Sequence, residues 1–269
     1  MSRFVTEALS EHSGVRISGI DVSVDADDEL VQQLLRLIYQ HAIICISDQV
    51  MTPGQLAKFA EHLGTPVPHV EESLHLDGVS EVMSLSNADD RDERQLNGGA
   101  HWHTDLIHTE EPASFTMLNA VAVPKSGGRT QFANQTLAFE KLSREKQKIY
   151  SELVIQHCYE GRTDGSMPVL EYPLVRHHAI TGKPALYGAF GTGIGIKGYT
   201  DSKASEIYRE IGKYATEEEF IYRHQYRLHD LVIWDNSQLL HAAEVLQRAK
   251  QDTEKRIMHR VSVRGWPQA

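Results

Sequence analysis

Apolar and polar residues alternate in short segments along most of the chain, and this period of two is typical of β-strands. Residues 14–25 (GVRISGIDVSVD) show the alternation near the start, and the apolar run at 42–47 (AIICIS) predicts a buried strand. Further strands are predicted at 114–123, 129–134, 220–236 and 256–263. The segment 173–190 predicts a hairpin that turns at Thr181-Gly182-Lys183.

Four segments instead space their apolar residues as amphipathic helices do. They are 25–42, 51–64, 135–154 and 201–215. The second carries clear helix-end signals, because Thr52 suits the N-cap, Pro53 suits the first helical position and Gly64 ends the pattern. The charged segment 87–99 has neither period and predicts an exposed loop.

Strands spread through the whole chain, with a few helices near the start and in the middle, do not form a regular strand–helix–strand alternation. This order argues against a doubly wound parallel sheet. It favours a mainly β protein with flanking helices, a cupin-like double-stranded β-helix (jelly roll). We find no repeat, linker or composition shift, so residues 1–269 are predicted to form a single domain.

Charge and cysteine content narrow the classes of partner. The net charge is −10, from 37 acidic and 27 basic residues, which argues against nucleic acid and anionic membranes as partners. Cys45 and Cys158 lie in apolar runs and are predicted to be buried thiols. Neither a signal peptide nor a membrane span is apparent, so we expect a cytoplasmic protein; assembly as a homo-oligomer is left open.

A candidate metal site lies in the segment HWHTD at 101–105. In a strand, residues two apart point to the same face, so His103 and Asp105 could bind one ion. The candidate for a third ligand is His241, after the apolar run LVIWDNSQLL. Two histidines and one carboxylate leave coordination positions open, as in non-haem Fe(II) oxygenases. His75 and Asp77 form a second H-x-D triplet and remain an alternative.

Four segments, in this order, resemble the taurine dioxygenase family, which includes the 2,4-dichlorophenoxyacetate dioxygenases. They are WHTD at 102–105, PKSGGRTQFAN at 124–134, DLVIWDN at 230–236 with the histidine five residues on, and RIMHR at 256–260. The resemblance implies that His103, Asp105 and His241 are the catalytic iron ligands and that 2-oxoglutarate and O2 are co-substrates. It also implies that Thr130 and Arg256 bind the distal carboxylate of 2-oxoglutarate, as a guanidinium fork can.

For the main substrate, the resemblance implies that His69 and Arg260 receive an anionic group. The alternative for Arg260 is a structural ion pair with one of the chain's carboxylates. The expected reaction is hydroxylation of a C–H bond in a small organic anion, a sulfonate or a carboxylate, with release of succinate and CO2. Ether cleavage of an aryloxyalkanoate by the same chemistry is an alternative, and a non-catalytic iron or zinc protein is a second.

The chain departs from the family pattern at three places. Ser237 follows WDN where the family usually has arginine, and the stretch from His241 to Arg256 is longer than usual. Residues 70–72 (VEE) do not reproduce the aromatic pocket of taurine dioxygenase, and Gly98-Gly99 replaces polar residues before WHTD. The third departure concerns the substrate pocket, so the resemblance does not specify taurine as the substrate.

Overall fold

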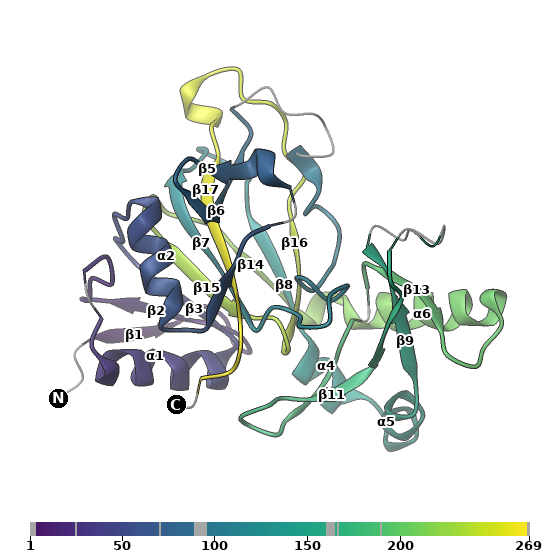
Figure 1. Cartoon of the computed structure of the whole chain (residues 1–269). Helices are drawn as coiled ribbons and strands as arrows, with labels where there is room; N and C mark the ends of the chain where they lie inside the picture. Colours follow the sequence, from purple (N-terminus) through teal and green to yellow (C-terminus); the bar gives the residue numbers. More distant parts are fainter. Residues whose placement is uncertain are drawn as a thin grey trace.

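Two packed β-sheets form the body of the protein, with helices outside them (Figure 1). The structure is a computed structural model, and it describes residues 4–24, 26–69, 71–88, 96–159, 165, 167–188 and 190–267. All strand pairs are antiparallel among these residues except β2 (Val15–Ser18) with β3 (Ile43–Ile46), which are parallel. The expected jelly roll with flanking helices is confirmed.

The large sheet has nine strands. Besides β2 and β3 they are β1 (Val5–Ala8), β4 (Thr65–Val67), β5 (His75–Leu76), β6 (Val79–Ser86), β7 (Phe115–Ala122), β15 (Leu231–Asp235) and β17 (Ile257–Arg264). They pair in the order β1-β2-β3-β15-β7-β17-β6-β5, and β4 also pairs with β17. The small sheet has the order β14 (Ile221–His224), β8 (Thr130–Asn134), β16 (Leu239–Ala243).

The central strands of the large sheet are buried on both faces. On β15, Leu231 and Ile233 pack with the helices on the outer face, whereas Val232 and Trp234 pack between the two sheets. In the inner layer Trp234 meets Phe132 of the small sheet, with ring centroids 5.4 Å apart. The segment 220–236, predicted as strand, contains two strands, β14 in the small sheet and β15 in the large sheet. Burial of β15 on both faces explains its apolar run.

Helices α1 (Asp28–His41) and α2 (Pro53–Glu61) cover the outer face of the large sheet (Figure 1). Both were predicted. As expected, Thr52 caps α2, and its side chain and that of Gln55 form a reciprocal capping box. The helix ends at Glu61, three residues before Gly64. Gly64 instead lies against β17, where an added Cβ would come within 2.3 Å of the carbonyl oxygen of Arg264.

The chain between β8 and β14 forms a smaller layer beside the sheets (Figure 1). It contains α4 (Gln135–Lys141), α5 (Arg144–Ser151), β9 (Val154–His157), β10 (Leu170–Pro173), β11 (Val175–His177), β12 (Pro184–Leu186), β13 (Gly193–Ile196) and α6 (Asp201–Ala215). Short 3-10 helices lie at η1 (Glu72–Leu74), η3 (Glu218–Phe220) and η4 (Asp252–Glu254).

Within this layer the single helix expected at 135–154 is wrong. Two helices form instead, because the Ser143 side chain accepts a hydrogen bond from the Lys146 backbone N–H and starts a new helix. Val154 already belongs to strand β9. The expected hairpin is confirmed, since β11 and β12 pair across a turn in which Gly182 has a φ of +69°.

Two further expectations concern exposure and membranes. Part of the charged segment expected as a loop, residues 89–95, lies outside the described residues. None of the helices in the described ranges has the length and apolar character needed to cross a bilayer.

Candidate active site

The three residues predicted as metal ligands lie in one cluster. Ligand atoms of His103, Asp105 and His241 all lie within 4.8 Å of one another. Nε2 of His103 is 3.7 Å from Oδ1 of Asp105, and Nε2 of His241 is 3.4 Å from Oδ2. Such a convergence of two imidazoles and one carboxylate is the arrangement expected around a single divalent ion.

The backbone brings the first and last of these residues together directly. His103 and His241 form an isolated β-bridge, in which each backbone N–H donates to the other residue's carbonyl at 3.0 Å. His241 lies inside β16, but the strand expected around 103–105 is wrong. Only His103 pairs there, and the chain then enters a turn in which Leu106 has a positive φ of 54°. The bridge at His103 and the turn after it therefore bring His103 and Asp105 together, as a regular strand was expected to do.

Two residues that the sequence did not single out orient Asp105. The Thr116 hydroxyl donates to Oδ2 of Asp105 at 2.7 Å, and Asn236 Nδ2 donates to the Thr116 hydroxyl at 3.0 Å. Asn236 is the last residue of the WDN segment, so that segment was the available signal. The contacts hold the carboxylate toward the two histidines, as hydrogen-bonded neighbours of metal ligands commonly do.

The hydrogen bonds and charges around the three ligand groups suit metal binding. His103 Nδ1–H donates to the His101 carbonyl at 2.7 Å, which leaves the lone pair on Nε2. Burial lowers the pKa of His241 to about 3. Burial alone would raise the pKa of Asp105, but Arg260 and then the two histidines outweigh it and hold that pKa below its usual range. Two imidazoles and one carboxylate fit Fe(II).

A cavity of about 780 Å³ opens next to this cluster, between the two sheets. Its wall includes residues of both sheets as well as of the loops before β7, and the predicted co-substrate residues Thr130 and Arg256 are among them. Arg256 is 3% exposed, and its Nε donates to the Gly128 carbonyl at 2.8 Å. Gly128 has a φ of +69°, and a Cβ there would lie 3.0 Å from Cδ of Arg256, so a larger residue at this position would be strained.

The environment of Arg256 fits a bound carboxylate. Considering only the described residues, no carboxylate lies within ion-pair distance of its guanidinium, and Nε is its one hydrogen-bonded nitrogen. A buried cation without a counter-ion is unfavourable. An anionic ligand in the cavity would supply that counter-ion, and the distal carboxylate of 2-oxoglutarate has the matching shape and charge.

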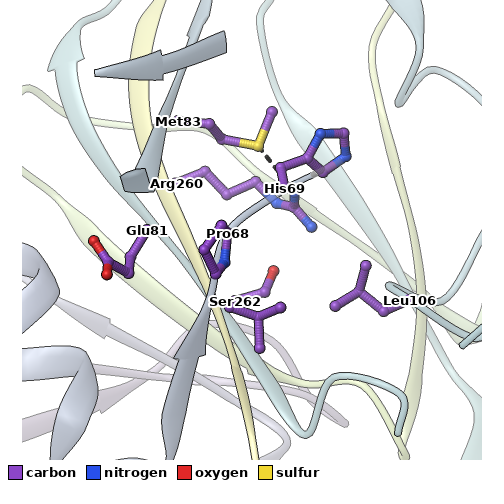
Figure 2. A pocket seen from close by; sticks show the side chains of 8 residues that line it. Pro68, His69, Glu81, Met83, Leu106, Arg260 and Ser262 are labelled. Carbon is purple, nitrogen blue, oxygen red and sulfur yellow. Dashed lines mark hydrogen bonds between the residues drawn. The ribbon is translucent and has the colours of Figure 1, made fainter. Parts of the chain in front are cut away.

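The two residues predicted to bind the main substrate also line the cavity. Figure 2 shows the Arg260 side chain running past Met83 toward His69. Nη2 of Arg260 donates to Oδ1 of Asp105 at 2.6 Å, and Nη1 lies 3.1 Å from Sδ of Met83. Arg260 therefore has an ion pair, as the alternative interpretation required, but its partner is the metal-ligand candidate Asp105.

His69 has the properties of a neutral hydrogen-bond donor. Its Nδ1 accepts from the Glu71 backbone N–H at 3.1 Å, so the proton is on Nε2. Burial, and then the nearby Arg260, lower its pKa to about 4. His69 thus carries no charge at neutral pH.

The other sequence features have ordinary surroundings. His75 Nε2–H donates to the carbonyl of His69 at 2.7 Å, and no metal-ligand cluster in the described part of the chain contains His75 or Asp77. Ser237 bonds to Asp235 Oδ1 at 2.7 Å in the turn between β15 and β16, so the loss of the usual arginine is accommodated locally. Of residues 70–72, Val70 lies outside the described residues.

Comparisons with known proteins agree with this chemistry. The model of the family described as taurine catabolism dioxygenase TauD, TfdA family matches residues 6–262. The chain is 28% identical over 250 residues to the alpha-ketoglutarate-dependent 2,4-dichlorophenoxyacetate dioxygenase of Cupriavidus pinatubonensis, covering 84% of this chain and 86% of that protein. It is 27% identical over 273 residues to the alpha-ketoglutarate-dependent sulfate ester dioxygenase of Pseudomonas putida, covering 94% of this chain and 86% of that one.

A solved structure supports the same conclusion. A taurine dioxygenase from Burkholderia xenovorans superimposes with a TM-score of 0.83 and 28% identity, over 98% of this chain and 90% of that chain. The alternative of a non-catalytic metal protein is thereby set aside. The chain belongs to the taurine catabolism dioxygenase TauD, TfdA family, and it is an Fe(II)- and 2-oxoglutarate-dependent dioxygenase.

Proposed function

We propose that this enzyme hydroxylates a C–H bond of a small organic anion, a sulfonate or a carboxylate. In this proposal His103, Asp105 and His241 hold the iron, and Thr130 and Arg256 hold 2-oxoglutarate. The observation that carries it is the ligand cluster beside a cavity whose wall also presents the buried cation Arg256. We also propose that residues 1–269 form one dioxygenase domain, since the family match runs over 6–262.

When bound, Fe(II) and 2-oxoglutarate supply the oxidising chemistry, in which O2 is consumed and succinate and CO2 are released with the hydroxylated product. The protein's part is to hold and orient. His103 and His241 present their Nε2 atoms to the ion, and Thr116 keeps the Asp105 carboxylate turned toward them. Arg256, which is 3% exposed, would neutralise the distal carboxylate of the co-substrate.

The charge of the site favours an anionic substrate. Among the described residues of the cavity, the most deeply placed charges are Asp105, Arg256 and Arg260, which leave one net positive charge. Fe(II) and the 2-oxoglutarate dianion have equal and opposite charges, so they do not alter this balance. A monoanion would neutralise the site. Glu71 also lines the cavity, but it is half-buried, where water screens its charge.

Arg260 can bind such an anion without releasing Asp105. A guanidinium has five N–H donors, and the contacts with Asp105 and Met83 use one hydrogen on each terminal nitrogen. The remaining N–H groups of Arg260 can donate hydrogen bonds to an anionic group at the same end of the cavity as His69. The Nε2–H of His69 adds a neutral donor. Arg260 would then connect the substrate's charged end with the metal ligand Asp105.

Ether cleavage of an aryloxyalkanoate by the same chemistry is a second candidate. It is supported by the relative named as a 2,4-dichlorophenoxyacetate dioxygenase and by the size of the cavity. Several lining residues are apolar and could surround an aromatic ring; they are Leu74, Leu85, Leu96, Leu106, Leu118 and Leu246.

The test compares wild type with Arg260→Ala on matched substrate pairs: an alkyl sulfonate with its methyl sulfone, and an aryloxyacetate with its amide. Substrate-dependent succinate release is the readout. We expect Arg260→Ala to lose activity selectively on the anions. Equal loss on both members of each pair, or on neither, would show that Arg260 does not bind the substrate's charge.

Arg264→Ala is the matched control, because Arg264 lies on the same strand and is not among the lining residues of the cavity. It should change neither class of substrate. The preferred member of the panel then distinguishes simple hydroxylation from ether cleavage.

A further inference from the structure

A buried tyrosine lies directly behind the two residues proposed to hold 2-oxoglutarate. Tyr226, in the loop between β14 and β15, is 4% exposed and is not itself a lining residue of the cavity. Its hydroxyl lies 2.9 Å from the Thr130 hydroxyl, and its ring lies under the Arg256 guanidinium, 5.5 Å from ring centroid to Cζ. Tyr226 therefore contacts both groups that would bind the distal carboxylate of 2-oxoglutarate, the Thr130 hydroxyl and the Arg256 guanidinium.

The direction of the Tyr226–Thr130 hydrogen bond follows from counting protons. Burial raises the pKa of Tyr226 to about 12, so its hydroxyl keeps its proton near neutral pH. Either hydroxyl could donate at this distance, but in the described part of the chain Thr130 is the one hydrogen-bond partner of the Tyr226 hydroxyl. Donation from Tyr226 to Thr130 is therefore the arrangement that gives the buried tyrosine proton an acceptor. A threonine hydroxyl has a single proton. Once Thr130 accepts from Tyr226, its own proton is free to point at an acceptor in the cavity.

The ring of Tyr226 also supports Arg256. A cation placed over an aromatic face is attracted to it, and this attraction strengthens where water is excluded. Together with the bond from Nε to the Gly128 carbonyl, the ring fixes the plane of the guanidinium. A guanidinium held in this way loses less conformational entropy when it binds a carboxylate.

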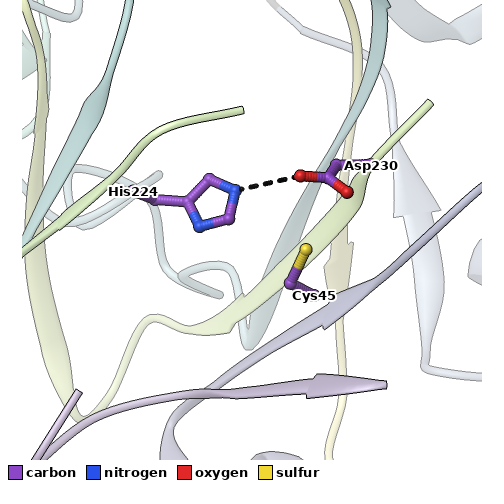
Figure 3. Close-up of side chains that lie close together, drawn as sticks. All are labelled: Cys45, His224 and Asp230. Atoms are coloured by element: carbon purple, nitrogen blue, oxygen red, sulfur yellow. Dashed lines mark ion pairs between the residues drawn. The ribbon is translucent and has the colours of Figure 1, made fainter. Parts of the chain in front are cut away.

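A second cluster of ligand-type side chains lies behind Tyr226. Cys45, His224 and Asp230 have ligand atoms within 4.8 Å of one another, and Figure 3 shows them converging. We do not assign a metal to them, because Arg16 already donates to both oxygens of Asp230, at 2.8 and 3.2 Å. A cation placed there would have to compete with that buried guanidinium.

This second cluster instead fixes the position of the tyrosine. The His224 ring packs edge-on against Tyr226, with centroids 4.6 Å apart, and its Nε2 lies 3.6 Å from Oδ2 of Asp230. The Tyr222 hydroxyl bonds to the other ring nitrogen of His224 at 2.9 Å. The Tyr222 hydroxyl thus holds the histidine through one ring nitrogen, and the histidine ring packs behind Tyr226.

We propose that Tyr226 is a positioning residue for 2-oxoglutarate. Tyr226 directs the Thr130 hydroxyl proton toward the distal carboxylate and fixes the plane of the Arg256 guanidinium. This inference rests on the proposed roles of Thr130 and Arg256. It assigns Tyr226 no contact with the co-substrate.

The test is the affinity of the Fe(II)-loaded protein for two 2-oxo acids, measured by anaerobic calorimetric titration. Tyr226→Phe keeps the ring over Arg256 and removes only the hydroxyl. The Kd for 2-oxoglutarate should rise about three- to tenfold, the effect of one hydrogen bond. The Kd for 2-oxopentanoate, which lacks the distal carboxylate, should not change. An equal rise for both acids, or no rise for either, would refute the positioning role.

Two further variants separate failure of this inference from failure of the proposed function. Tyr214→Phe is the matched control, since it removes a half-buried tyrosine hydroxyl that donates to the Ala138 carbonyl at 2.9 Å and bonds to neither Thr130 nor Arg256, and it should leave both affinities unchanged. In a Thr130→Val background, Tyr226→Phe should have no additional effect. If Thr130→Val weakens 2-oxoglutarate binding but Tyr226→Phe does not, only the positioning role fails. If Thr130→Val also has no effect, the proposed role of Thr130 in the co-substrate site fails.

Discussion

Replacing Arg256 with methionine should separate co-substrate binding from folding. Arg256 is 3% exposed and has no described carboxylate partner, so its charge has little function in the unliganded fold. Methionine fills much of the same volume without charge. The substitution also leaves the Gly128 carbonyl without its donor, which costs about 1–3 kcal/mol and opposes the gain from removing a buried charge. We therefore expect only a small change in the stability of the unliganded protein.

The effect on 2-oxoglutarate binding should be much larger. Truncating one partner of a buried charge pair costs about 2–5 kcal/mol, and the lower end applies because the cavity admits water. A loss of about 2.7 kcal/mol raises Kd about 100-fold. At a 2-oxoglutarate concentration 100 times the wild-type Kd, ligand-linked stabilisation should fall from about 2.7 to about 0.4 kcal/mol.

The assay is chemical unfolding of the Fe(II)-loaded protein under anaerobic conditions, with and without 2-oxoglutarate, and Arg264→Met is the control. Arg264 is the last residue of β17, the strand that begins directly after Arg256, and its side chain is 31% exposed. Arg256→Met should lose most of the stabilisation that 2-oxoglutarate gives, and Arg264→Met should keep it. Full retention by Arg256→Met would refute the argument, and the co-substrate carboxylate would then have to bind elsewhere.

Three other predictions concern the metal site, acid stability and a helix cap. Thr116→Val removes the hydrogen bond to Asp105 and should weaken Fe(II) binding about 10- to 100-fold in an anaerobic equilibrium titration, whereas an unchanged Kd would show that the bond does not orient the ligand. His157 is fully buried, and burial lowers its pKa to about 4, so the unfolded chain binds its proton first and stability should fall as the pH drops from about 6.5 to 4. His157→Gln should remove up to about 3 kcal/mol of that loss in urea unfolding, and an unaltered pH dependence would contradict this assignment. Ser143→Ala should cost about 1 kcal/mol of unfolding free energy through loss of the α5 cap, and no change in urea midpoint would count against the cap.

Local signals in the sequence predicted much of the fold. Thr52 and Pro53 start α2 as expected, and the apolar run at 42–47 becomes the buried strand β3. These features depend on residues close together in the chain, so pattern and spacing suffice. The break at Ser143 was also local, but the apolar period that continues past it concealed the cap.

The site depended more on contacts between distant segments. The residue types at 103, 105 and 241 were sufficient to nominate a metal site, but not to choose between His103-Asp105 and the second triplet at 75–77. The family resemblance favoured the first triplet, and the bridge from His103 to His241, which forms only in the folded protein, brings its ligands together. The contact between Thr130 and Tyr226 spans 96 positions and has no local signal, which is why Tyr226 was missed.

The central claim is that His103, Asp105 and His241 bind the iron. The most direct measurement is the anaerobic Kd for Fe(II) of wild type, Asp105→Ala and Asp77→Ala, with circular dichroism to confirm that each variant is folded. Asp77 belongs to the competing H-x-D triplet and is the matched control. We predict that Asp105→Ala loses high-affinity Fe(II) binding and that Asp77→Ala binds like wild type. Wild-type affinity in Asp105→Ala, or loss of binding in Asp77→Ala, would contradict the claim.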